Sequence, residues 1–338
     1  IITPYYDSLL VKSTTYGLDH AKAVQKMLRV LQEFRIRGVK TNIGFLINVL
    51  KSPEFVDGSY NVNFIDNHPE LFELPVVQDR GTKLLEYISD TTINGYAGAG
   101  HQEKTEFEPL ELPSVENGPY PDGTKQKFDA MGPEKFSQWI KEQHKVFFTD
   151  TTMRDAHQSL FATRVRTIDM LRVLEAASKK LPNLFSYECW GGATFDVAYR
   201  FLYEDPWVRL RQMREKAPNI LLQMLVRGAN AVGYTSYPDN VVKNFIDLSA
   251  KNGIDVFRVF DSLNSLDNMY GTIQAVRENN KLAEVALCYT GDILDPSRNK
   301  YDLAYYVNMA KELKNAGANI IAIRGRSSFQ SPAYVSIE

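Results

Sequence analysis

The stretch Phe148-Thr-Asp-Thr-Thr-Met-Arg-Asp-Ala-His-Gln-Ser159 overlaps the end of the short apolar run Val146-Phe-Phe148, which has the composition of a buried strand. It brings two aspartates, an arginine, a histidine and a glutamine to the end of that strand. Such a group suits a divalent metal and an anionic substrate. The alternative is a solvated loop whose charges pair with one another, and the stretch alone favours neither.

Outward from this point, strand and helix patterns alternate strictly. Apolar runs predict parallel strands covered on both faces at residues 145–150, 184–189, 219–226, 255–260, 284–289 and 319–323. Apolar residues at helical spacing predict helices on the faces Ile168/Leu171/Leu174, Val241/Phe245/Leu248, Met269/Ile273/Val276 and Leu303/Val307/Ala310. Asp205-Pro206 predicts an N-cap followed by a proline at the first helical position.

Six strand-helix repeats fit either an open doubly wound sheet or a (β/α)8 TIM barrel cut short. No Gly-x-Gly-x-x-Gly follows a strand, which argues against a dinucleotide-dependent oxidoreductase. Polar residues follow the strand ends instead, at Arg154-Asp155, Glu188, Arg227 and Asp261. Barrel enzymes place their chemistry at that end. We therefore predict an α/β fold in which residues 144–323 form a truncated TIM barrel of about six strands.

Two different segments precede this barrel. Residues 1–98 predict an α+β piece, with a strand at Ser8–Lys12, a helix capped by Asp19 and a helix over Ile43–Leu50. Residues 99–143 are rich in Pro, Gly and Glu without periodicity, which predicts an interdomain linker.

Composition excludes several classes of protein. The formal net charge of -2 gives no global field that attracts nucleic acid or an anionic membrane. The two cysteines, Cys189 and Cys288, lie in apolar runs and predict core packing in a reducing compartment. No apolar run approaches the ~20 residues of a membrane helix, and no signal peptide is visible. The opening Ile1-Ile-Thr-Pro4 predicts that the chain is a fragment of a longer protein.

The loops after the first three strands supply the candidate site residues. Asp155 can hold a hard divalent metal, Arg154 can clamp a carboxylate, and Gln158 can hydrogen-bond a developing enolate oxygen. After the second strand, Asp196 follows the paired glycines 191–192. The alternative is a purely structural role, in which Asp196 caps the N-terminus of the next helix.

Arg227 and Tyr234 follow the third strand, where Arg227 can reach a pocket and Tyr234 can place a phenol over it. The alternatives are that Arg227 is only solvated and that Tyr234 only packs against its neighbours. Because three successive loops offer polar groups to one volume, we favour a functional site.

These residues also carry a resemblance to a known family. Four segments resemble, in order, the carboxyltransferase domain of the pyruvate carboxylase family. They are residues 148–166, Glu188-Cys-Trp-Gly-Gly-Ala-Thr-Phe-Asp196, Arg227-Gly-Ala-Asn-Ala-Val-Gly-Tyr234 and Phe257-Arg-Val-Phe-Asp-Ser-Leu-Asn264. Oxaloacetate decarboxylase and transcarboxylase subunits share this barrel. Two earlier segments resemble the end of a biotin carboxylase domain: Pro4-Tyr-Tyr-Asp-Ser-Leu-Leu-Val-Lys12 and Phe34-Arg-Ile-Arg-Gly-Val-Lys-Thr-Asn42. Because this piece is fused ahead of the barrel, it favours single-chain pyruvate carboxylase.

The resemblance implies a biotin-dependent carboxylation of pyruvate to oxaloacetate. ATP-Mg and bicarbonate would carboxylate biotin in an absent part of the biotin carboxylase domain, and carboxybiotin would then transfer its carboxyl group to the pyruvate enolate at the barrel. Asp155 would ligate a divalent metal, Mn²⁺ or Zn²⁺. Arg154, Gln158 and Arg227 would line the pyruvate site, and Asp196 and Tyr234 the pocket for carboxybiotin. The family also implies a homo-oligomer, a tetramer, in the cytoplasm of a bacterium or in the mitochondrial matrix.

The last predicted strand departs from the family pattern. There the family reads Ile-Lys-Asp-Met-Ala-Gly, whose carboxylated lysine ligates the metal, whereas this chain reads Ile323-Arg-Gly-Arg-Ser-Ser-Phe-Gln330. Arg324 cannot replace that lysine, because a guanidinium stays protonated and forms no stable carbamate. Residues 324–338 form an atypical tail. We therefore expect the isolated chain to bind metal weakly and to make no oxaloacetate, and a non-catalytic, partner-binding remnant is the alternative.

Overall fold

The computed structural model describes residues 9–36, 39–74, 80–96, 111, 114–115, 118–290, 293, 297 and 300–325. Contacts divide these residues into two units: residues 11–96 form the smaller one, and residues 111–325, together with residues 9–10, form the larger one. Each unit is described by itself. The expected tail, residues 324–338, lies outside the described residues apart from Arg324 and Gly325.

Among its described residues, the smaller unit contains helices joined by irregular segments and no strand. It contains α1 His20–Glu33, α2 Ile43–Lys51, α3 Pro53–Asp57, α4 Phe64–Asn67, the 3₁₀ turn η1 Pro69–Phe72 and α5 Arg80–Ile93. The carboxylate of Asp19 accepts the backbone N–H of Lys22 at 2.7 Å, which confirms the predicted cap. Val24, Leu31 and Leu50 form its core. The strand predicted at Ser8–Lys12 is wrong for residues 9–12, which belong to no helix or strand.

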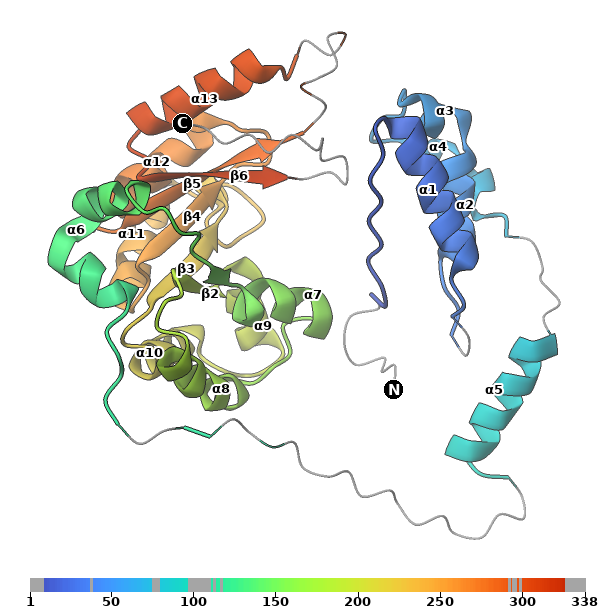
Figure 1. Cartoon of the computed structure of the whole chain (residues 1–338), viewed down its shortest axis with the longest axis horizontal. Helices are drawn as coiled ribbons and strands as arrows, with labels where there is room; N and C mark the ends of the chain where they lie inside the picture. Colours follow the sequence, from blue (N-terminus) through green and yellow to red (C-terminus); the bar gives the residue numbers. More distant parts are fainter. Residues whose placement is uncertain are drawn as a thin grey trace. The chain divides into compact units, whose positions relative to one another are not determined.

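The larger unit contains one parallel sheet in which each strand after the first pairs with the strand that precedes it in the sequence. The order is β1 Thr149–Asp150, β2 Ser186–Trp190, β3 Leu221–Val226, β4 Val256–Phe260, β5 Leu282–Tyr289 and β6 Ile320–Gly325. The sheet curls into a half-barrel with helices around it (Figure 1). This confirms the truncated TIM barrel and removes the doubly wound alternative, because a doubly wound sheet reverses its strand order.

Helices and short helical turns follow the strands along the chain. They are η2 Thr152–Ala156, α7 His157–Phe161, α8 Thr167–Lys180, α9 Gly192–Arg200, α10 Pro206–Lys216, η3 Gly228–Asn230, α11 Asp239–Lys251, α12 Leu266–Glu278 and α13 Leu303–Asn315. Asp205 caps α10 by accepting the backbone N–H of Trp207 at 2.7 Å, as predicted. The predicted cysteine burial is also confirmed for Cys189 and Cys288.

The predicted buried faces of three outer helices need correction. Ile168, Val241, Leu248, Leu303 and Val307 are exposed. In α8, Leu174 is buried as predicted, together with Met170. In α11 and α13 the buried positions lie beside the predicted ones, at Val242, Ile246 and Ser249 and at Tyr306 and Leu313. These helices carry apolar residues on more than one side, so the spacing alone does not identify the face that packs on the sheet.

Helix α6, Thr124–Lys141, occupies much of the segment that was predicted as a linker. It bends at Gly132, whose φ of 72° lies in the left-handed region that favours glycine, and Pro133 follows. Its side chains Phe128 and Phe136 pack against Phe185 and against the first residues of β3, β4 and β5. The helix therefore closes the amino end of the half-barrel and leaves the carboxyl end for the candidate site.

Candidate active site at the carboxyl rim

The chain turns sharply where β1 ends. The carboxylate of Asp150 accepts the backbone N–H of Thr152 at 2.7 Å, and the carbonyl of Thr151 accepts the N–H of Ala156 at 3.2 Å. The second bond closes a wide π-helical turn, a feature often found at functional sites. This turn carries Arg154 and Asp155 to the carboxyl rim, the edge of the sheet at which the parallel strands end.

Arg154 is held by two carboxylates of different exposure. Its Nε donates to Oε1 of Glu188 in β2, a side chain with 0% exposure, and its Nη1 lies 3.2 Å from Oδ1 of Asp155. The carboxylate of Asp155 is 59% exposed. One guanidinium thus links the interior of the half-barrel to the solvent at the carboxyl rim.

Below Arg154, polar side chains continue through the inner face of the sheet. Glu188 also accepts from Nη1 of Arg258 in β4 at 2.6 Å, and Nε of Arg258 donates to Glu284 in β5 at 2.6 Å. Nε2 of Gln223 in β3 donates to Glu284 at 3.0 Å. We call these five side chains, Arg154, Glu188, Arg258, Glu284 and Gln223, the interior ion-pair network.

Burial would lower the pKa of Arg258, but Glu284 and then Glu188 outweigh that effect and raise it. Asp155 contributes in the same direction, so its carboxylate acts on Arg258 as well as on Arg154. The guanidinium therefore stays charged inside the sheet, and the network stays ion-paired.

The loops after β1, β2 and β3 approach one another closely. A Cβ on Gly191 would lie 3.4 Å from Cδ of Arg154 and 3.6 Å from the carbonyl oxygen of Leu225 in β3. A Cβ on Gly192 would lie 2.8 Å from the carbonyl oxygen of Val232, too close for any side chain. The paired glycines therefore allow the three loops to meet, as expected for a shared site.

Arg227 and Tyr234 lie together after β3. Nη1 of Arg227 donates to the carbonyl of Gly233 at 3.3 Å, and the guanidinium carbon lies 5.4 Å from the centre of the Tyr234 ring. Tyr234 is 73% exposed, so it is not a packing residue. Its phenol ring is open to a ligand from solvent.

Asp196 lies within α9, where it pairs with Arg200 at 2.5 Å. Since α9 begins at Gly192, with Gly191 as its N-cap, the alternative reading of Asp196 as a helix cap is wrong. The pKa of Arg200 is raised by Asp196, with a smaller contribution from Tyr234. Arg200 therefore pairs with Asp196 within α9 and also lies near enough to Tyr234 to interact with it electrostatically.

Gln158 and His157, which also belong to the stretch 148–159, have different environments. Gln158 is exposed on α7, one helical position beyond His157. His157 is only 3% exposed, and its Nε2 accepts the backbone N–H of Val165 at 2.8 Å. Burial, followed by the charge of Arg209, lowers the pKa of His157 to about 4. The histidine is a neutral structural group rather than part of the site.

Comparison with known proteins gives the geometry its context. Over 98% of its length the chain is 56% identical to pyruvate carboxylase of Bacillus subtilis (strain 168) and 49% identical to mitochondrial pyruvate carboxylase of Rattus norvegicus. The chain belongs to the pyruvate carboxylase family. It spans only 29% and 28% of the length of these two relatives.

Domain and structural comparisons agree with this membership of the pyruvate carboxylase family. Residues 1–67 match the biotin carboxylase C-terminal domain. A complete multifunctional pyruvate carboxylase from Rhizobium etli is 56% identical with a TM-score of 0.63, over 89% of this chain and 28% of that one. Its carboxyl transferase domain with oxamate and biotin is 57% identical with a TM-score of 0.63, over 72% of this chain and 41% of that one.

The metal site that the pyruvate carboxylase resemblance implies does not fit the described side chains. Among them, no group of three or more His, Cys, Asp and Glu residues is placed to hold a metal ion. Asp155 faces the guanidinium of Arg154 instead. Arg324, where the resemblance would imply a metal-binding lysine, lies over Phe260 with its guanidinium carbon 4.2 Å from the ring centre.

Sequence reasoning missed Gln223, Arg258 and Glu284. Each is a polar residue in the middle of an apolar strand, and that interruption is the signal that was available. Within a parallel strand such a residue points either to the outer helices or to the inside of the barrel. All three point inward, where they meet Glu188 or one another.

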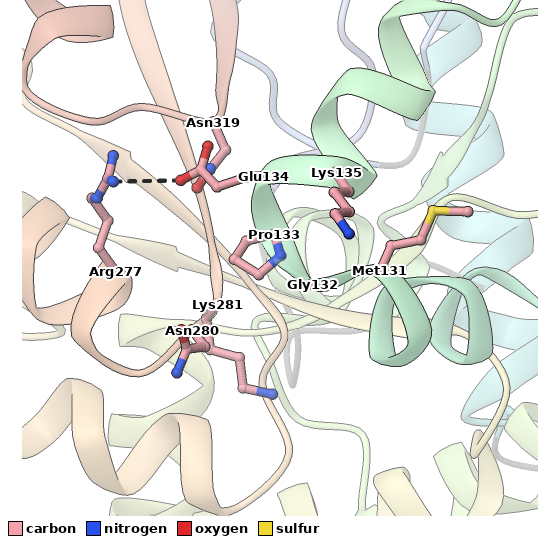
Figure 2. Close-up of a pocket in the computed structure, with 9 residues that line it drawn as sticks. All are labelled: Met131, Gly132, Pro133, Glu134, Lys135, Arg277, Asn280, Lys281 and Asn319. Carbon is pink, nitrogen blue, oxygen red and sulfur yellow. Dashed lines mark ion pairs between the residues drawn. The ribbon is translucent and has the colours of Figure 1, made fainter.

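A separate cavity lies at the opposite, amino end of the half-barrel (Figure 2). It has a volume of about 400 Å³ and lies between the bend of α6, the end of α12 and the residues that precede β5 and β6. Arg277 pairs with Glu134 across it at 3.4 Å. No residue of the carboxyl rim lines it, so it is independent of the candidate site.

No helix in the described ranges is both long enough and apolar enough to span a membrane.

Proposed function

We propose that this chain forms the carboxyltransferase part of a longer biotin-dependent enzyme that converts pyruvate into oxaloacetate. The observation that carries the proposal is Arg154, which lies at the carboxyl rim with its Nε fixed by buried Glu188, beside the loop that carries Arg227. Two guanidiniums at one rim suit a small carboxylate substrate. The membership of the pyruvate carboxylase family supports pyruvate as that substrate.

In this proposal each candidate residue has a defined task. Arg154 and Arg227 bind the pyruvate carboxylate, and Gln158 donates a hydrogen bond to the oxygen that becomes negative in the enolate. Asp196 and Tyr234 border the side from which the carboxyl donor arrives. Biotin, carried elsewhere in the protein and charged there with ATP-Mg and bicarbonate, supplies CO₂ and takes up the proton that pyruvate loses. The enolate carbon then forms the new bond to CO₂.

The divalent metal, Mn²⁺ or Zn²⁺ with Asp155 as a ligand, has no support from the described side chains, and no step is assigned to it. We infer that the isolated 338-residue chain binds such metals weakly and makes no oxaloacetate. Stoichiometric tight binding in a metal titration would contradict this inference.

Binding of oxamate, a compound bound in a carboxyl transferase domain from Rhizobium etli, tests the substrate proposal directly. We expect saturable binding by calorimetry, weakened at least about tenfold by Arg227→Ala, because one charge-assisted contact is lost. Lys135→Ala is the matched control, since it removes a cation from the amino-end cavity. Absence of binding to the unaltered chain would favour a non-catalytic remnant that only binds partners.

Assembly and location follow the family as proposals. We propose a homo-oligomer, a tetramer, in a bacterial cytoplasm or a mitochondrial matrix. The relative from Rattus norvegicus is named as a mitochondrial protein, which supports the mitochondrial matrix if the source of this chain is eukaryotic. A related decarboxylase or transcarboxylase subunit is less well supported, because residues 1–67 match a biotin carboxylase domain ahead of the barrel. Light scattering tests the assembly.

A further inference from the structure

Buried charges inside the half-barrel are arranged in strict alternation. Along the interior ion-pair network, Arg154 meets Glu188, Glu188 meets Arg258, and Arg258 meets Glu284. Two guanidiniums thus balance two carboxylates. The exposed fractions of the Glu188 and Glu284 side chains are 0% and 6%. A buried set of this kind is tolerated only when every charge has its partner, so each member fixes the next.

Glu188 is the member that divides its two oxygens between different strands. Oε1 accepts from Arg154 beyond β1, and Oε2 accepts from Arg258 of β4. Its backbone belongs to β2, which is paired on both sides, with β1 and with β3. The carboxylate therefore sits on a rigid element and cannot turn without breaking one of its two ion pairs.

Arg154 itself comes from a short turn and has no comparable backbone support. Nε is engaged by Glu188 and Nη1 lies near Asp155. Among the described residues, Nη2 donates to no protein group, so that nitrogen remains for a ligand. A guanidinium is planar, and fixing its Nε and Nη1 fixes the direction in which Nη2 points.

We propose that Glu188 is the positioning residue of Arg154, and that Arg258, anchored by Glu284, holds Glu188 in the orientation that aims Nη2 at a bound carboxylate. The inference rests on the proposed function for the identity of that carboxylate. The positioning of Arg154 can be measured independently of any ligand.

The experiment compares the 338-residue chain with Glu188→Gln. An amide offers one acceptor oxygen where two arginines each need one, and it carries no charge. We expect solvent exchange of the Arg154 Nε proton, followed by ¹⁵N NMR and assigned with Arg154→Lys, to rise at least about tenfold. We also expect oxamate to bind at least about tenfold more weakly.

Asp255→Asn is the matched control. Asp255 is likewise a buried carboxylate that pairs with more than one cation, namely Arg214, Lys281 and Lys125, but it lies before β4 at the amino end of the sheet. This variant should lose comparable stability while the Arg154 proton and oxamate binding stay unchanged. If Glu188→Gln does not fold, Arg258→Lys serves instead, because a single ammonium cannot bridge Glu188 and Glu284 as the guanidinium does.

Unchanged Arg154 exchange in a folded Glu188→Gln or Arg258→Lys chain would overturn the positioning proposal. Equal changes in Asp255→Asn would also overturn it, because they would reveal a general loosening. Failure of the unaltered chain to bind oxamate would instead count against the proposed function, and the exchange measurement would still decide the role of Glu188.

Discussion

The guanidinium of Arg209, which has 0% exposure, donates from Nη2 to Oε2 of Glu204 at 2.6 Å. The same carboxylate accepts the hydroxyl of Thr167 at 2.5 Å, and Nε of Arg209 donates to that hydroxyl at 2.7 Å. This closed triangle joins the start of α8 to α10 on the outer side of the half-barrel. The pKa of Glu204 is lowered: burial opposes the shift, but the bonds from Thr167 and Arg209 outweigh it.

Replacing Glu204 with Gln should destabilise the larger unit by roughly 3 kcal/mol, because it leaves the Arg209 charge buried without its partner. Urea denaturation followed by circular dichroism measures the loss. Glu278→Gln is the comparison, since Glu278 pairs with Lys243 at an exposed site, and we expect less than about 1 kcal/mol there. Equal losses in both variants would refute the role of burial.

His157 should make stability depend on pH. The unfolded chain takes up a proton at this histidine below about pH 6.5. The folded chain does not until its pKa of about 4. Because the unfolded state then binds more protons, the free energy of unfolding should fall as the pH drops through this window, by up to about 1.4 kcal/mol per pH unit.

His157→Gln should flatten that slope, since glutamine offers a neutral acceptor to the Val165 amide and cannot titrate. Denaturation midpoints between pH 4 and 6.5 measure it. His144→Gln, at an exposed histidine in the same unit, should leave the slope as it is. A slope that survives in His157→Gln would assign the effect to other groups.

Gly192→Ala should disturb the candidate site without touching a candidate residue. The added Cβ would lie 2.8 Å from the carbonyl oxygen of Val232, so the loops after β2 and β3 must separate. We expect a loss of stability of about 1–3 kcal/mol and weaker oxamate binding. Gly271→Ala in α12 has its nearest atom at 3.9 Å and should be neutral or stabilising by up to about 1 kcal/mol. Similar behaviour of the two variants would contradict the close approach.

Divalent metal should add little to the stability of the isolated chain. The described residues offer no set of three metal-ligating side chains, and Asp155 is already paired with Arg154. Thermal melts with Mn²⁺, with Zn²⁺ and with a chelator should therefore agree within about 1 °C, since a ligand stabilises only in proportion to its binding. A saturable rise in the midpoint that Asp155→Asn abolishes would show that the inference is wrong.

Phe136→Ala should show that α6 is part of the barrel core. The ring of Phe136 has 0% exposure and packs edge-on against Phe128, with ring centres 5.6 Å apart. Its loss should cost about 3–5 kcal/mol in chemical denaturation. Val146→Ala, at a side chain with 78% exposure, should change stability by less than about 0.5 kcal/mol. A small effect of Phe136→Ala would mean that α6 packs only loosely.

The strand-helix alternation predicted the half-barrel because the strands from β2 to β6 are mostly apolar runs. The strand predicted at residues 145–150 is wrong for residues 145–148, since β1 contains only Thr149 and Asp150 and the side chains of Val146 and Phe148 are exposed. Gly253 and Gly317, with φ values of 125° and 105°, lie just beyond the ends of α11 and α13. Helix α6 escaped prediction because Gly132 and Pro133 interrupt it, and both residues normally end a helix. The structure instead uses them to bend the helix over the open amino end.

The candidate site was predictable only at its surface. Arg154, Asp155 and Arg227 follow strand ends, which the sequence displays directly. The ion pairs beneath them join residues that are distant in the sequence, such as Glu188 and Arg258. Their meeting depends on the register between strands, where Gln223 pairs with Val256 and Arg258 with Glu284. Register is a property of the folded sheet and has no local signature.

The unbroken order from β1 to β6 bears on how the protein is made. Each strand that leaves the ribosome finds its only earlier partner already synthesised, so the sheet can grow by accretion in the direction of translation. Arg154, by contrast, is held by Glu188, and the ion pair between Glu188 and Arg258 can form only after β4 has been synthesised. Nascent chains shorter than that strand would therefore carry a rim whose arginine is still unanchored.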